Sequence, residues 1–173
     1  MIGRLMFVAA AASLALAGAA LADDKPTDPQ IAHIAYTAGN IDIEAAQLAL
    51  GKSHNPAVRE FATTMLRDHK AVNVQALALV KKLGVTPQTN ATSEALAKQA
   101  AETKARLTAL KGAEFDRAYA ANEVAYHATV NGALKSTLIP SAHNAALKAL
   151  LETGLTLFSE HQAHAEHLAA ILK

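Results

Sequence analysis

Apolar residues recur every three to four positions along most of the chain, and nowhere do they alternate as they would in a strand. This period places the apolar side chains on one face of an α-helix. Helix start and stop signals divide the pattern into separate segments. We therefore predict an all-α chain with four long helices and one shorter helix, over about residues 28–52, 56–84, 92–112, 113–136 and 141–171.

The segment boundaries rest on capping residues, prolines and one glycine. Asp28-Pro29 and Asn55-Pro56 each place a capping residue before a proline at the first helical position. Gly84 is expected to end the second helix in a left-handed conformation. The stretch Leu138-Ile139-Pro140 predicts a break, after which Ser141 is expected to cap the last helix.

Polar residues interrupt the apolar stripe on each of the four long helices. Asp42, His69, His127 and His161 all fall at inward-facing positions, and Glu123 precedes His127 by four residues on the same face. Burying carboxylates and imidazoles costs several kcal/mol unless they are paired or bound to a metal. Helix bundles build metal sites from such side chains on facing helices.

The heights of these residues along a bundle can be compared. We assume that the first two helices form a hairpin and that the short third helix is the crossover to the fourth. The five polar residues then lie about 10 to 15 residues below the shared end of the bundle. At a rise of roughly 1.5 Å per residue they share one slab several ångströms thick.

The pattern therefore predicts a transition-metal site in the core, and imidazole and carboxylate ligands suit iron, zinc, copper or manganese. The candidate ligands are Asp42, His69, Glu123, His127 and His161, with Glu44, Asp68 and His164 at the periphery. Because metal binding needs neutral imidazole, its affinity is expected to fall with pH near a histidine pKa of about 6.5. The alternative is a hydrogen-bonded network of the same side chains without metal.

The first 22 residues have the pattern of an export signal. Arg4 precedes the apolar run from Leu5 to Ala17, and Ala20-Leu21-Ala22 fits a small-x-small cleavage site. We expect cleavage after Ala22, a single mature domain over residues 23–173, and a periplasmic or secreted location. No later segment is long and apolar enough to span a bilayer, so no stable span is expected after cleavage.

Composition narrows the classes of function. Without Arg4 the mature chain has 15 basic and 15 acidic residues and no basic run, which argues against nucleic acid as a partner. The chain has no cysteine, so thiolate chemistry and disulfides are excluded. It shows neither a glycine-rich phosphate loop nor a nucleophile elbow, so its status as an enzyme stays open. An envelope protein partner or a homo-oligomer remains as an expectation.

Several stretches resemble the family called domain of unknown function 4142. They are Asp28-Pro29, the block from Asn55 to Ala62 with Met65 and Asp68-His69, the block from Gly112 to Tyr119, His127, and Glu160-His161. The resemblance covers about residues 28 to 172. It implies an exported bacterial protein with a ferritin-like helical bundle, in which Asp42 and Glu44 fall where members often carry two acidic residues one apart.

The chain departs from the di-iron pattern of ferritin-like oxidases, which use a Glu-x-x-His pair on each of two helices. Here the pair is Glu123 and His127, with three residues between them. A histidine-rich mononuclear site, or no metal, fits this spacing better. The predicted function is metal handling or protection against oxidative or envelope stress. The alternative is a non-enzymatic envelope module whose core polar residues form only a hydrogen-bonded network.

Overall fold

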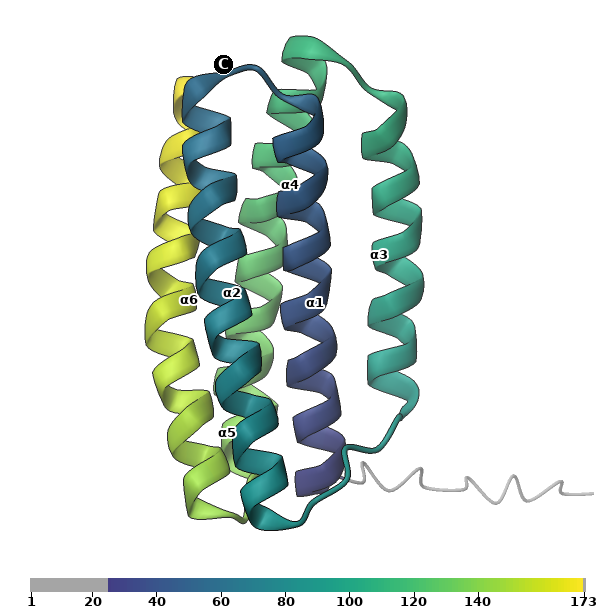
Figure 1. The fold of residues 1–173 in the computed structure, drawn as a ribbon, viewed down its shortest axis with the longest axis vertical. Coiled ribbons are helices and arrows are strands. Elements are labelled where there is room, and N and C mark those ends of the chain that lie inside the picture. Colours follow the sequence, from purple (N-terminus) through teal and green to yellow (C-terminus); the bar gives the residue numbers. More distant parts are fainter. Residues whose placement is uncertain (1–24, 173) are drawn as a thin grey trace, which may run out of the picture.

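The computed structural model describes residues 25–172, and the predicted export signal, residues 1–22, lies outside this range. The described part is a bundle of helices without strands, which confirms the all-α prediction (Figure 1). Its elements are α1 (Asp28–Lys52), α2 (Pro56–Leu83), α3 (Ala91–Ala109), α4 (Gly112–Ala133), a π-helix η1 (Leu134–Leu138), α5 (Ile139–Ser141) and α6 (Ala145–Ile171).

The four long helices are connected as the sequence predicted. Helices α1 and α2 form an antiparallel hairpin, and α4 and α6 form a second pair (Figure 1). Helix α3 runs along the outside of the bundle, mainly against α1, and returns the chain to the end where α4 begins. In the described residues, no helix combines the length and the hydropathy that crossing a bilayer requires.

The ends of the first two helices follow from local chemistry. The side chain of Asn55 accepts hydrogen bonds from the backbone N–H groups of Ala57 and Val58, as an N-cap does. Gly84 ends α2 with φ +64°, a left-handed conformation that a Cβ would strain. At α1 the N-cap is Thr27, one residue earlier than the predicted Asp28.

The predicted break and cap before the last helix are wrong in their positions. Helix α4 continues through η1 into α5, which contains Pro140, and the N-cap of α6 is Asn144 instead of Ser141. In this π-helical turn the N–H of Ile139 donates to the carbonyl oxygen of Leu134, five residues earlier, so the helix continues up to Pro140, which has no N–H to donate. The carboxylate of Asp28 accepts the N–H groups of His143 and Asn144, which fixes the start of α6 there.

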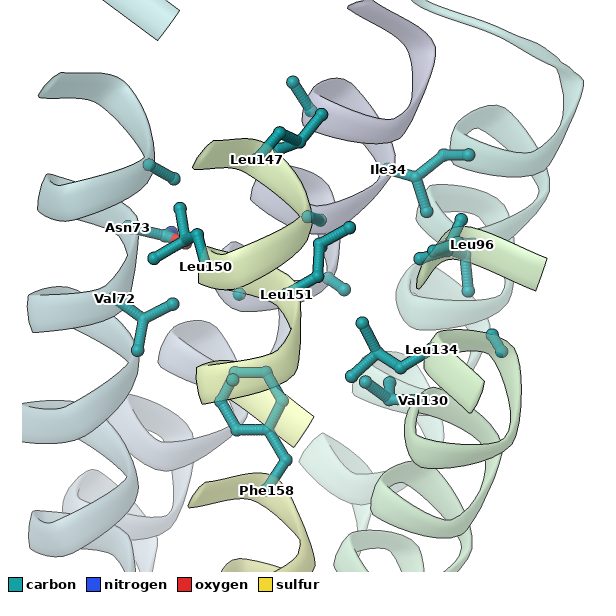
Figure 2. A pocket seen from close by; sticks show the side chains of 18 of the residues that line it. Ile34, Val72, Asn73, Leu96, Val130, Leu134, Leu147, Leu150, Leu151 and Phe158 are labelled. Carbon is teal, nitrogen blue, oxygen red and sulfur yellow. The ribbon is translucent and has the colours of Figure 1, made fainter. Parts of the chain in front are cut away.

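Two apolar clusters fill the bundle at different heights. One contains Phe61, Phe115 and Leu168 near the end where α1 and α2 meet. The other lies near the opposite end and includes Ile34 and Leu151, among the side chains that Figure 2 shows. Asp42, His69, Glu123, His127 and His161 are buried between the two clusters, so the core has a polar layer inside it.

Candidate metal centre

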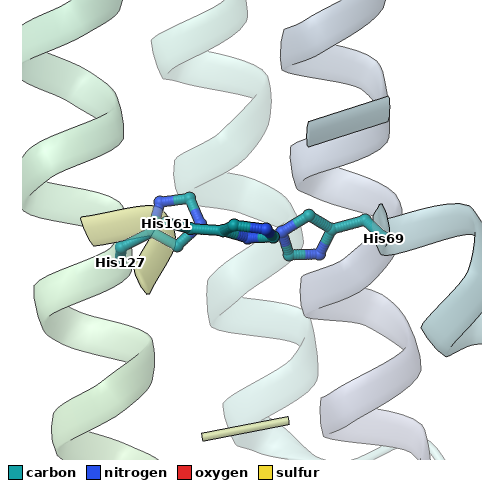
Figure 3. Close-up of side chains that lie close together, drawn as sticks. All are labelled: His69, His127 and His161. Atoms are coloured by element: carbon teal, nitrogen blue, oxygen red, sulfur yellow. The ribbon is translucent and has the colours of Figure 1, made fainter. Parts of the chain in front are cut away.

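All five predicted ligand positions meet in this layer. Asp42, His69, Glu123, His127 and His161 are each at most 3% exposed, and they come from α1, α2, α4, α4 and α6 respectively. One ring nitrogen from each of the three histidines lies within 4.8 Å of the others, and the rings point toward one another (Figure 3). A second group of the same size joins Asp42, Glu123 and His127.

Asp42 links the two groups. Its Oδ2 atom is 3.4 Å from Nε2 of His69 and 3.4 Å from Nε2 of His127. When both acids are ionised, neither carboxylate oxygen of Asp42 has a hydrogen-bond partner among the described residues, although both are buried, and a hydrogen bond to Glu123 needs a proton on one of the two acids. A carboxylate between two imidazole nitrogens, at distances longer than a good hydrogen bond, has the arrangement of ligands around a cation.

The tautomer of His127 is set by its own helix. Its Nδ1 atom is 3.0 Å from the backbone carbonyl oxygen of Glu123. A carbonyl oxygen only accepts, so Nδ1 carries the proton and donates it. The lone pair is therefore on Nε2, the buried atom near Asp42 that lacks a partner.

His161 has the other tautomer, with the proton on Nε2, because a carboxylate accepts a hydrogen bond from that atom. Its Nε2 atom is 3.1 Å from Oδ2 of Asp68, and the Arg67 guanidinium binds the same carboxylate at 2.7 and 3.0 Å. The hydrogen bond from Arg67 lowers the pKa of Asp68, so the carboxylate is ionised and accepts the proton of Nε2. This leaves a lone pair on the buried Nδ1 atom, which has no partner in the described chain. Carboxylates and carbonyls hold metal-ligating histidines in this way.

His69 is positioned by packing alone. Its ring stacks on Phe158 with centroids 4.7 Å apart and planes 6° apart. Both ring nitrogens are buried without a hydrogen-bond partner in residues 25–172. Because only the face of the His69 ring contacts Phe158, both ring nitrogens at its edge stay free to bind a cation.

Burial shifts the pKa values of the cluster toward uncharged forms. It raises the pKa of Asp42 to about 7 and that of Glu123 well above its usual range, and repulsion between the two acids raises Glu123 further. Burial lowers the pKa of His69 to about 3 and of His127 to about 4, with the neighbouring histidines adding repulsion, and it lowers that of His161. The imidazoles are therefore neutral near pH 7, the form in which they bind metals.

The predicted peripheral residues separate into three cases. Asp68 contacts His161 directly, as described above. His164 is half-buried and packs edge-on against Phe61, with centroids 4.9 Å apart, so it lies outside both ligand groups. Glu44 is exposed and pairs with Lys104 of α3 at 2.8 Å, because a position two residues from Asp42 lies on another face of α1.

Sequence reasoning missed two contributions to the site. Asn131 is buried, and its amide donates to the backbone oxygen of Phe158 and to Gln162, which ties α4 to α6 beside the cluster. Its place four residues after His127 was the available signal. The stacking of Phe158 on His69 depends on the packing of α2 against α6, which no local pattern specifies.

Three imidazoles and two carboxylates form a donor set suited to a first-row transition metal. Comparisons with curated proteins and with solved structures returned no match. The family model described as Domain of unknown function (DUF4142) matches residues 11–168, which is most of the chain. The protein therefore belongs to the DUF4142 family.

Proposed function

We propose that the protein binds one first-row transition-metal ion through Asp42, His69, His127 and His161, with Glu123 as a further ligand or as a partner of the ligands. The ion would be iron, zinc, copper or manganese. We further propose an exported protein, cleaved after Ala22, that acts in metal handling or in protection against oxidative or envelope stress.

The observation that carries the proposal is a set of buried polar atoms without partners, gathered in one place. In the described chain these are Oδ1 and Oδ2 of Asp42, Nδ1 and Nε2 of His69, Oε2 of Glu123, Nε2 of His127 and Nδ1 of His161. A buried donor or acceptor left unsatisfied costs about 1–3 kcal/mol. A cation bound here would satisfy atoms from at least three of these residues at once, because ligand atoms of His69, His127 and His161, and likewise of Asp42, Glu123 and His127, lie within 4.8 Å of one another.

A hydrogen-bonded network without metal accounts for fewer of these atoms. The nearest approaches of His69 and His127 to Asp42 are 3.4 Å, whereas N–H···O hydrogen bonds centre near 2.9–3.0 Å. The tautomer of His127 directs a lone pair, not a proton, toward Asp42. Because burial raises the pKa of Asp42 to about 7, its protonated form can donate to one of these nitrogens, but one proton satisfies one lone pair, whereas a cation would satisfy both.

A second candidate function is a non-enzymatic envelope module that acts through its outer faces. The observation that favours it is a pair of exposed apolar side chains on α2, Val74 and Leu77, which are 66% and 45% exposed. They are three residues apart and so lie on one face of the helix. A stable assembly that is unchanged by chelators and is lost in Val74→Ser would favour this reading over the metal centre.

The first test is the metal content of the exported protein, purified untagged and without chelator. Mass spectrometry should find close to one equivalent of a transition metal and an N-terminus at Asp23. His69→Ala and His127→Ala should each lose the metal, whereas His167→Ala, an exposed histidine on α6, should retain it. A metal-free protein that gains no thermal stability from added iron, zinc, copper or manganese would contradict the proposal, as would full metal content in both variants.

A further inference from the structure

A partly open cavity of about 90 Å³ lies between the helices on the side of the polar layer where α6 begins, and the exposed residue Thr129 is part of its lining. Its walls come from α1, α2, α4 and α6, with side chains of η1 and α3 completing them (Figure 2). The larger lining residues are aliphatic, among them Ile34, Leu134 and Leu151. Interiors normally pack without spaces larger than a water molecule, so a space of this size is a distinct feature of the core.

The walls of the cavity offer few hydrogen-bond partners to a water molecule. Of its lining residues only Asn73 and Thr129 have polar side chains. The amide of Asn73 donates to Oδ1 of Asn40, and the hydroxyl of Thr129 donates to the backbone oxygen of Ala125. A buried water needs two to four polar partners, and apolar cavities without them stay dry. The chemistry of the walls therefore selects an apolar occupant.

The volume restricts that occupant further. An apolar cavity of about 150 Å³ in another protein binds benzene or xenon. The present cavity is smaller, so it suits a single xenon atom or a diatomic molecule better than an aromatic ring. We infer that this cavity is a binding site for a small apolar gas molecule of the size of dioxygen.

Phe158 lies between this cavity and the candidate metal centre. Its ring lines the cavity and also contacts the histidines, at 4.7 Å from His69 and 5.9 Å from His161 between ring centroids. A Cβ built on Gly154 would lie 3.4 Å from the Phe158 ring, which is ordinary van der Waals contact, so the backbone of α6 at Gly154 lies close to the ring. A molecule held in the cavity is therefore one aromatic ring away from the cluster.

Any supply of the bound gas to a metal beside Phe158 rests on the proposed function, but binding of the gas in the cavity does not. Xenon is a suitable probe because it has the size and polarity of the expected occupant and is visible by its X-ray scattering. Crystals of the metal-free protein pressurised with xenon should show one site within the cavity. In solution, methyl resonances of Ile34 and Leu151 should broaden under dioxygen pressure more than those of Leu168, which is buried in the other cluster.

Variants identify the cavity as the site. Leu151→Phe should fill the space and abolish xenon binding, whereas the matched control Leu77→Phe, on the exposed face of α2, should leave it unchanged. Leu151→Ala, which removes atoms and avoids overpacking, should increase xenon occupancy. An empty cavity in the native chain, or occupancy that neither Leu151 variant alters, overturns the inference. Xenon bound in a protein that never takes up metal would refute the proposed function and leave this inference standing.

Discussion

Metal affinity should be controlled by the proton on Asp42. Burial raises the pKa of this carboxyl to about 7, whereas the pKa values of His69 and His127 are lowered to about 3 and 4. Between pH 5 and pH 7 the two imidazoles are already neutral, and Asp42 is the group that must lose a proton before a cation binds. Affinity therefore rises with pH up to about 7 and then flattens. The sequence predicted the same direction but assigned it to histidines titrating near 6.5.

The size of the effect follows from the ionised fraction of Asp42. With a pKa of about 7 the carboxylate is about half ionised at pH 7 and about one-hundredth ionised at pH 5, so affinity falls by about 50-fold, or roughly 2.3 kcal/mol. Three histidines with an ordinary pKa of about 6.5 would instead lose about 10⁴-fold over the same range. The pKa of Glu123 is also raised, so protonation of Glu123 as the pH falls would add to the loss of affinity caused by Asp42.

Cobalt(II) titrations followed by visible d–d absorption would measure the affinity from pH 5 to pH 8. Asp42→Asn keeps the shape of the side chain and an oxygen ligand but removes the proton, so it should flatten the pH dependence contributed by this residue. Glu44→Gln, which changes an exposed carboxylate two residues away, should preserve the native profile. An unchanged pH slope in Asp42→Asn would refute the reasoning, because the titrating groups would then be others.

Three further substitutions test separate parts of the structure. Asp68→Asn removes the carboxylate that accepts the hydrogen bond from His161, and it should lower cobalt affinity by about 10- to 100-fold while leaving the fold intact. An affinity equal to that of the native protein would contradict this role. Asp28→Ala removes the acceptor of two backbone N–H groups before α6, so urea unfolding should show a free energy of unfolding lower by about 1–3 kcal/mol. An unchanged unfolding midpoint would show that this contact does not stabilise the fold. Glu123→Met replaces a buried acid that has an unpartnered oxygen, so in EDTA it should raise the free energy of unfolding by about 1 kcal/mol or more. A variant less stable than the metal-free native protein would show that Glu123 is satisfied without a cation.

The sequence predicted the elements and the convergence of the polar layer because both depend on local rules. Helical period decides which residues face inward, so Asp42, His69 and His127 were recognisable as inward positions without a structure. The rise per residue then placed them at one height once the crossover was assumed. Capping chemistry located the start of α2 at Asn55 and its end at Gly84.

The remaining features depend on contacts between distant parts of the chain. The start of α6 is fixed by Asp28, more than a hundred residues earlier, and no pattern around Ser141 reveals that contact. The sequence placed Asp68 at the periphery of the site but could not show that its partner is His161 on another helix. The cavity arises from how side chains of several helices fail to fill the space between them, which is a property of packing and not of periodicity.

The polar layer makes the stability of the bundle conditional on what binds there. Without a cation, buried groups from four helices remain unsatisfied between two apolar clusters, and each lowers the free energy of unfolding. A cation that binds only the folded chain adds RT ln(1 + [L]/Kd), which is about 2.7 kcal/mol at a free concentration one hundred times Kd. Because the ligands lie on α1, α2, α4 and α6, this gain is shared by all four long helices. Metal should therefore slow amide hydrogen exchange on each of them near the layer, while the outer helix α3, which contributes no ligand, should change least.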